Sequence, residues 1–205
     1  MSRWIVISAA ALVLALVAAQ LLIPELGERG IEDRLTEGGG SAEVGLSAVP
    51  ALRLLFEDGD RLEISASDLE LEIDERTDTL DRLDGFDAVD VSLIDSRTGP
   101  IELESFALTR GGEDPYRLVA SGRTSAEALA DFGFDSLGLP GGDFAEIFLD
   151  RVLGDGGDAA LPVELDMQLI SEDGRLRVIS GGGTIAGLDT GPLAELLTTA
   201  IVVRL

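Results

Sequence analysis

The sequence predicts an α+β domain that follows an N-terminal membrane-spanning helix. One observation is a long apolar run near the start of the chain, and a second is a series of short segments in which apolar and polar residues alternate, as in strands. A third is a set of short stretches with helically spaced apolar residues. With 205 residues, 45% of them apolar, the chain is long enough for one ordinary domain plus a targeting element, and it can build a core.

The apolar run covers residues 4–23 and is interrupted by only two polar side chains. As a helix rising about 1.5 Å per residue it extends about 30 Å, which is the thickness of the hydrocarbon core of a bilayer. Arg3 precedes the run and an acidic remainder follows it, so the positive-inside rule places Arg3 in the cytoplasm and the remainder outside. The sequence therefore predicts a signal anchor over 1–24 and an exported domain over 25–205, in a single-pass protein of the cell membrane.

The alternative is cleavage by a signal peptidase after Ala19, because Val17 and Ala19 occupy the small-residue positions of a cleavage site. The mature protein would then be secreted or periplasmic. The apolar run continues to Ile23, beyond the length of a typical signal core, which favours the uncleaved anchor.

The elements of the exported domain follow in order. Helical spacing over 26–35 predicts that the anchor helix continues past Pro24 until the three glycines at 38–40. Alternation predicts strands at 44–48 and 62–66. It then resumes with opposite parity over 69–73, so a bulge or tight bend is expected near Ser67 and Asp68.

Alternation, turns and helical stripes predict the remaining elements. Further strands are expected over 89–93, 101–103 and 116–122, and the clearest hairpin is expected over 163–178; their turns are Gly99-Pro100 and Asp173-Gly174. Short helices are expected from Ser125, from Asp143 and over 193–201. The order of helix, antiparallel strands, short helices, hairpin and helix is that of an α+β protein.

Composition excludes several classes of function. All 15 basic residues are Arg against 39 acidic residues, a net charge of −24, so a nucleic-acid interface, which needs a basic face, is not expected. The chain has no Cys and no His, which excludes catalytic triads that use them and removes the commonest metal ligand. We therefore expect no enzymatic activity, no cofactor and no metal.

Three kinds of motif occur without the context that their function requires. The run GGGTIA at 181–186 fits a dinucleotide-binding pattern but lacks a following βαβ unit, so it is interpreted as a flexible strand exit. The run FDSLG at 134–138 lacks the first glycine of a nucleophile elbow. Two acidic glycine-containing runs, at 57–63 and 154–161, lack the ligand spacing of a calcium loop and are interpreted as turns.

A cluster of large apolar residues directly after Pro50 is the candidate site. One interpretation is that these residues close the end of the sheet as core. The other is that they join apolar residues of the later helices to line a pocket for acyl chains, since ligand pockets are mostly apolar. The predicted lipid-binding residues are Leu52, Leu54, Leu55, Phe56, Phe132, Phe134, Leu137, Phe144 and Phe148.

The chain also resembles a known family. The segments that carry the resemblance are ERGIEDRL, AEVGLSA, PALRLLFEDGDRLEISASDLEL, FDAVDVSLID, RTSAEALADFG and LPVELDMQLISEDGRLRVISGGG, between residues 26 and 183. They are similar to the LmeA-like family of phospholipid-binding envelope proteins of high-GC Gram-positive bacteria. The run LTRGGEDPYRLVASGRT is a departure, since it is more charged than the family pattern.

The resemblance implies a fold like that of the tubular lipid-binding domains: a curved, mostly antiparallel sheet packed on a long N-terminal helix, with additional short helices. It also implies a membrane-anchored cell-envelope protein that binds phospholipid of unspecified head group, for lipid carriage or presentation. The alternatives are a non-catalytic envelope scaffold whose sheet binds a protein partner, and an accessory factor for a membrane glycosyltransferase.

Overall fold

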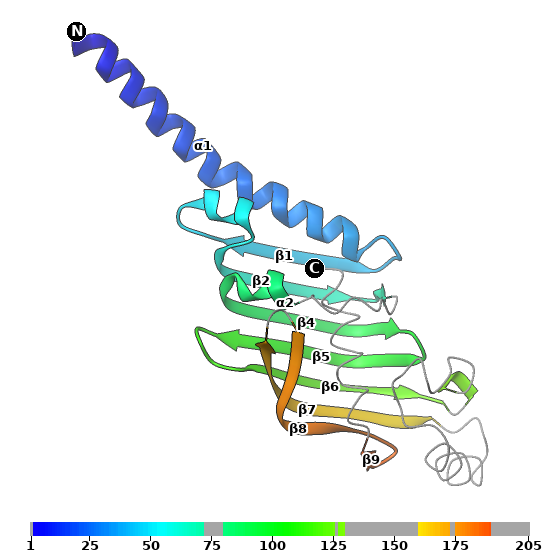
Figure 1. Cartoon of the computed structure of the whole chain (residues 1–205). Coiled ribbons are helices and arrows are strands. Elements are labelled where there is room, and N and C mark those ends of the chain that lie inside the picture. The colour runs from blue at the N-terminus through cyan, green and yellow to red at the C-terminus, as the bar shows by residue number, and fades with distance from the viewer. Residues whose placement is uncertain (1, 72–79, 126, 130–159, 173–174, 190–205) are drawn as a thin grey trace.

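The computed structural model describes residues 2–71, 80–125, 127–129, 160–172 and 175–189, without the side chains of 2–13, 15–16, 80–81, 175–176 and 188–189. It consists of an N-terminal helix and a mostly antiparallel, open sheet, which confirms the α+β class (Figure 1). The elements are α1 (Ser2–Leu35), β1 (Ser41–Ser47), the 3-10 helix η1 (Ala51–Phe56), β2 (Gly59–Ser67), β3 (Glu70–Leu71), α2 (Leu80–Asp84), β4 (Phe86–Thr98), β5 (Ile101–Gly111), β6 (Tyr116–Thr124), β7 (Leu161–Glu172), β8 (Arg175–Ile185) and β9 (Leu188–Asp189).

The sheet has nine strands, of which eight follow the order β1-β2-β4-β5-β6-β7-β8-β9. From β4 to β9 each strand pairs antiparallel with the next strand in this order. The exception to antiparallel pairing is the junction with β4, which pairs parallel with both β2 and the short β3. Among the described strands the one crossover is between β2 and β4, and the connection contains β3 and α2.

One face of the sheet is apolar and buried, and we call it the inner face. Facing pairs such as Val91 with Leu108 and Leu118 with Met167 continue across neighbouring strands, because alternate residues point to the same side of a sheet. The inner face comprises Val44, Leu62, Ile64, Val89, Val91, Leu93, Leu103, Phe106, Leu108, Leu118, Ala120, Val163, Leu165, Met167, Leu169 and Ile185.

The opposite, outer face is polar and carries ion pairs between strands. Arg61 of β2 lies 3.8 Å from Asp90 of β4, and Arg117 of β6 lies 3.4 Å from Asp166 of β7. These side chains are about half exposed or more. Within each strand, alternate residues thus face the core and the solvent, as the alternation in the sequence predicts.

The predicted continuation of the N-terminal helix past Pro24 is confirmed, and the continued part covers the edge of the sheet. Glu28 accepts a hydrogen bond from the backbone N–H of Leu46 at 2.8 Å, and Glu32 accepts one from Val44 at 3.1 Å. The two carboxylates are one helical turn apart, and the two amides are two residues apart on the edge strand β1. Side chains of α1 therefore take the place that a further strand would occupy.

The expected change of parity near residue 68 is confirmed. Asp68 has φ of 56°, and after it Leu69 and Leu71 point to the core. The backbone N–H of Leu69 donates to the buried hydroxyl of Ser96 at 3.2 Å. A polar side chain in the core is thereby used to bind the displaced backbone.

The late hairpin is confirmed as β7 and β8, but GGGTIA is not a strand exit. Residues 181–185 belong to β8, and Gly181 has φ of 81° and lies against the carbonyl of Asp166, so no side chain fits there. The ladder is irregular at the neighbouring Gln168 and Leu169, and the hairpin contacts α2. Figure 1 shows its outer part turned across the sheet toward α2.

The helix expected from Ser125 begins as predicted. The Ser125 hydroxyl accepts a hydrogen bond from the backbone N–H of Ala128 at 3.1 Å, which is the contact that an N-cap residue makes. The helices expected from Asp143 and over 193–201 lie outside the described residues.

Candidate functional site

The apolar cluster after Pro50 forms the 3-10 helix η1, and its residues separate into ridges three apart. Ala51 is buried, and Leu54 packs against the core. Leu52 and Leu55 form the outward ridge, and Phe56 beside them is the most exposed, at 82% of its surface. Neither sequence interpretation describes the whole cluster, since one ridge faces the core and another faces outward.

The remaining predicted lipid-binding residues cannot be placed beside η1. Phe132, Phe134, Leu137, Phe144 and Phe148 all lie outside the described residues. The pocket expected between them and η1 stays a prediction. Val49, which the sequence analysis did not select, joins the exposed residues of η1 at 74% exposure.

Gln20 of α1 holds η1 in place. Its amide nitrogen donates to the carbonyl of Ala48 at 2.7 Å, and its amide oxygen accepts from the N–H of Ala51 at 2.8 Å. Both polar ends of the side chain are therefore bonded to the segment that enters η1. In the sequence, Gln20 stands out as a polar residue inside the apolar run 4–23. Its hydrogen-bond partners could not be predicted, because the sequence does not show that η1 lies beside it.

The outward side of α1 is apolar next to η1 and charged beyond it. Leu14, Val17, Leu21 and Leu22 are exposed, and the exposed pair Glu25–Arg29 follows, with its charged atoms 2.6 Å apart. We call the exposed residues of this half of α1 together with those around η1 the apolar shoulder. It consists of Leu14, Val17, Leu21, Leu22, Val49, Leu52, Leu55 and Phe56.

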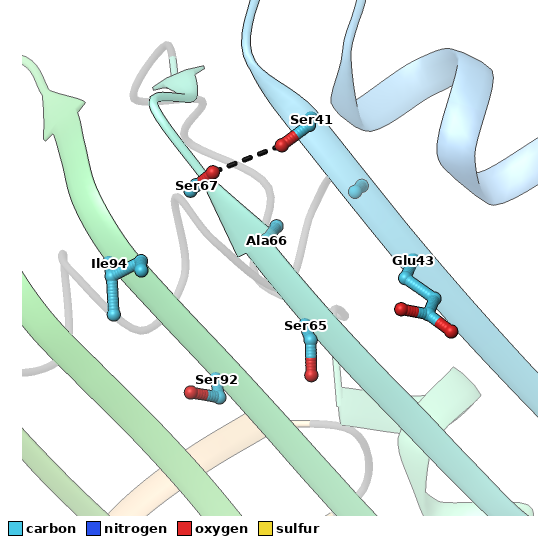
Figure 2. A pocket seen from close by; sticks show the side chains of 8 residues that line it. Ser41, Glu43, Ser65, Ala66, Ser67, Ser92 and Ile94 are labelled. Atoms are coloured by element: carbon cyan, nitrogen blue, oxygen red, sulfur yellow. Dashed lines mark hydrogen bonds between the residues drawn. The ribbon is translucent and has the colours of Figure 1, made fainter.

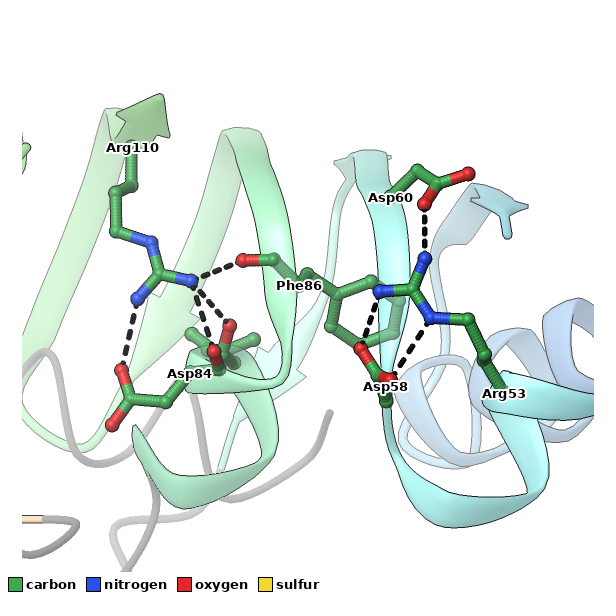
Figure 3. Close-up of polar contacts among 7 residues, drawn as sticks. Arg53, Asp58, Asp60, Asp84, Phe86 and Arg110 are labelled. Carbon is green, nitrogen blue, oxygen red and sulfur yellow. Dashed lines mark hydrogen bonds and ion pairs between the residues drawn. The ribbon is translucent and has the colours of Figure 1, made fainter. Parts of the chain in front are cut away.

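The single charge of η1 is paired with two acidic residues that follow the helix. Arg53 donates two hydrogen bonds to Asp58, at 2.7 and 2.9 Å, and a further one to Asp60 (Figure 3). Hydrogen bonding to Arg53 holds the pKa of Asp58 below its usual value. The guanidinium, whose side chain is 30% exposed, is therefore engaged by two carboxylates of the segment that follows η1.

A second polar cluster lies where α2 meets β4 and β5. The guanidinium of Arg110, with a side chain only 11% exposed, donates to the Asp84 carboxylate at 3.0 Å and to the Leu83 and Phe86 carbonyls (Figure 3). It also stacks 4.5 Å from the centre of the Tyr116 ring, and the Tyr116 hydroxyl donates to Asp84 at 2.9 Å. Burial, with a smaller contribution from Asp84, raises the pKa of Tyr116 far above its usual value, and Arg110 opposes the shift.

This cluster has the composition of a structural tie rather than a reactive centre. The Asp84 carboxylate accepts from both Arg110 and Tyr116, and the terminal nitrogens of the guanidinium donate to this carboxylate and to backbone carbonyls, whereas the buried Arg110 Nε has no partner among the described residues. It fastens the α2 turn to the first residues of β4.

The outer face carries two open hollows. One, of about 390 Å³, is lined mainly by small and polar side chains, and Figure 2 shows the hydrogen bond between Ser41 and Ser67 at its rim. Ile94 is the one large apolar side chain in it. The other, of about 410 Å³, contains Arg61, Asp90 and Arg117. Neither has the apolar lining that an acyl chain requires.

The described residues offer neither a membrane-spanning helix nor a metal site. They contain no helix that is both long and apolar enough to cross a membrane, and no group of three or more Asp or Glu placed to hold a metal ion. The anchor over 4–23 stays a prediction from the sequence.

Comparison with models of protein families, with curated proteins and with solved structures finds no match to this chain. The resemblance to the LmeA-like family therefore stays a prediction.

Proposed function

We propose that this protein is a membrane-anchored envelope protein that binds phospholipid acyl chains against the inner face of its curved sheet, for lipid carriage or presentation. The observation that supports it is the breadth of that face, which continues as apolar side chains from β1 to β8, with the Arg110–Asp84 ion pair at its α2 end. An acyl chain needs such a surface, because each buried CH₂ contributes about 0.8 kcal/mol.

The open form of the sheet supports the same proposal. Its nine strands do not close on themselves, so the inner face, whose side chains are buried, ends at open edges where we expect a long ligand to enter. The outer face, with its ion pairs and serines, stays in water. A lipid would place its chains on one side of the strands and leave its head group in solvent.

Charge indicates weak selection among head groups. Most arginines on the described surface are paired with carboxylates, as in Arg97 with Glu102 and Arg123 with Glu104. Recognition of a phosphate by its charge usually requires arginines that present free donors. We therefore expect binding to depend on the acyl chains.

The test uses the full chain in phosphatidylcholine vesicles that contain a phospholipid with a photoactivatable diazirine near the end of one acyl chain. After irradiation, adducts are located residue by residue by mass spectrometry. Strand β6 contains its own control, because Leu118 and Ala120 belong to the inner face and Val119 between them is exposed on the outer face. We expect adducts at 118 and 120 and none at 119.

Adducts confined to the apolar run and to η1 would overturn the proposal, since lipid would then contact the anchor without entering the domain. That result would favour the scaffold alternative, in which the sheet serves a protein partner.

A further inference from the structure

Exposed apolar side chains are concentrated at one place on the described surface. Of the thirteen large apolar side chains that are exposed there, nine belong to α1 or to the segment around η1. The other four are Ile94, Val119, Val178 and Ile179, which lie on three separate strands. Single exposed apolar residues are ordinary, but a contiguous group indicates a contact surface.

The position of η1 along the axis of α1, relative to the end of the apolar run, indicates what this surface contacts. Gln20 binds both ends of the Ala48–Ala51 segment, so η1 lies beside the last turn of the apolar run. At about 1.5 Å per residue, Gln20 is about 5 Å from the end of that run at Ile23. The outward side of the helix becomes charged only at Glu25 and Arg29. The exposed ridge of η1 therefore lies on the apolar side of this boundary.

We propose that η1 is a second membrane contact, in which Val49, Leu52, Leu55 and Phe56 insert into the interfacial region of the leaflet that α1 leaves. This inference rests on the proposed function, because it takes α1 as the anchor. Its consequence is orientation: α1 and η1 together hold the end of the sheet at which β1 leads into η1 at the bilayer surface, where lipid would pass to the inner face.

The chemistry of the surface fits uncharged or zwitterionic lipid. Leucine, valine and phenylalanine on a short helix match the boundary between head groups and acyl chains, where amphipathic elements lie with their apolar side buried. The only charge on η1, Arg53, is bound by Asp58 and Asp60, and the chain carries a net charge of −24. Attraction to anionic lipid is therefore not the basis of the contact.

The same features argue against a second protein as the occupant. The shoulder is continuous with the helix that enters the bilayer, since Gln20 joins the two directly and Leu21 and Leu22 are exposed beside it. A protein that covered η1 alone would leave these neighbours in water. One bilayer covers both.

The absence of cysteine makes a direct test available, because one introduced thiol is then the only one in the chain. Full chains with Leu55→Cys or Phe56→Cys carry a spin label and are reconstituted in phosphatidylcholine vesicles. The control is Val119→Cys, an exposed valine on the outer face of β6. Collisions with oxygen, which partitions into lipid, and with a water-soluble nickel complex are measured by electron paramagnetic resonance.

We expect labels at 55 and 56 to collide several-fold more with oxygen than with the nickel complex, and the label at 119 to show the reverse. Gln20→Ala removes both bonds to η1, so in this background the labels at 55 and 56 should become more accessible to nickel. Labels at 55 and 56 that behave as at 119 would overturn the inference. Labels shielded from both reagents would also overturn it, and would indicate a protein contact.

Failure of this inference is distinguishable from failure of the proposed function. Acyl-chain adducts at Leu118 and Ala120 report lipid in the domain, whereas the labels at 55 and 56 report the position of η1. Adducts on β6 together with nickel-accessible labels would reject only the second membrane contact.

Discussion

At the scale of single residues, the most connected side chain is Arg110. It ties Asp84, the carbonyls of α2 and the ring of Tyr116 into one cluster, although the sequence presents it only as one of 15 arginines. Its hydrogen-bond partners come from segments 24 to 27 residues earlier in the chain. The role of such a residue depends on tertiary placement, which a local pattern does not contain.

We expect Arg110→Ala to lower the free energy of unfolding by about 2–3 kcal/mol, because it leaves a carboxylate and carbonyls without their donor. The value lies below the range for fully buried pairs because the Asp84 side chain is 32% exposed. The matched control is Arg117→Ala, whose pair with Asp166 is more than 60% exposed on both sides; its effect should stay within about 0.5 kcal/mol. Denaturant unfolding followed by circular dichroism measures both, and equal effects would contradict the assignment.

Tyr116 gives a pH prediction that can be read without interference. It is the only tyrosine, and the chain has neither Lys nor Cys, so it is the only side chain expected to titrate between about pH 9 and 11.5. Because burial raises its pKa in the folded state, phenolate absorbance should be absent at pH 11 in the folded protein and present in denaturant.

The sign of the stability change follows from the same shift. The raised pKa stabilises the fold fully below the unfolded value of about 10, and this contribution is lost as the pH rises above it, by up to about 1.4 kcal/mol per pH unit. Tyr116→Phe should remove this dependence. A folded protein whose tyrosine ionises near pH 10 would show that the side chain is not buried.

At the scale of elements, the edge of the sheet is closed by a helix. Exposed edge strands pair with other chains, and here Glu28 and Glu32 occupy the free amides of Leu46 and Val44. Gly27 leaves room for the Leu46 side chain, because a Cβ at that position would lie 2.8 Å from the Leu46 Cδ1 methyl.

We expect the double change Glu28→Ala and Glu32→Ala to destabilise the domain by about 1 kcal/mol per lost bond and to expose the β1 edge. Hydrogen exchange should accelerate at the amides of Val44 and Leu46, and sedimentation should show association. Glu25→Ala, which removes an exposed pair on the outward side of the same helix, is the control. Unchanged exchange at both amides would refute this role.

Element by element, alternation and turn residues were sufficient to predict β1, β2, β4 to β8 and the change of parity at Asp68. They were not sufficient to predict the parallel pairing of β2 with β4. Both strands alternate, and an alternating pattern does not indicate which strand lies beside it. In η1 the sequence identified the apolar residues but not their sides, since a ridge spacing of three appears only once the segment is known to be a 3-10 helix. The hydrogen bonds of Gln20 depend on the position of η1 and could not be predicted from the sequence either.

At the scale of the whole molecule, the domain and its helix are joined by side-chain bonds along the edge of the sheet. Gln20, Glu28 and Glu32 contact the segment 44–51 over more than three helical turns. The proposed anchor therefore sets the orientation of the sheet as well as its distance from the membrane. A flexible linker would set the distance alone.

The anchor itself is tested by placing charge on the exposed side of α1. Leu14 lies near the middle of the run 4–23, and it is exposed, as is Val17, so arginine at both positions should leave the fold intact. In a bilayer each such arginine costs about 2.5–3.5 kcal/mol near the centre of the helix. We expect the unchanged chain to stay with membranes after alkaline extraction and the double variant to be released with unchanged circular dichroism.

The control is Leu26→Arg, because Leu26 is equally exposed but lies beyond the apolar run; this variant should stay in the membrane fraction. Release of the unchanged chain with Gln20 at its N-terminus would instead establish cleavage after Ala19, and the second membrane contact would then have to hold the domain without an anchor.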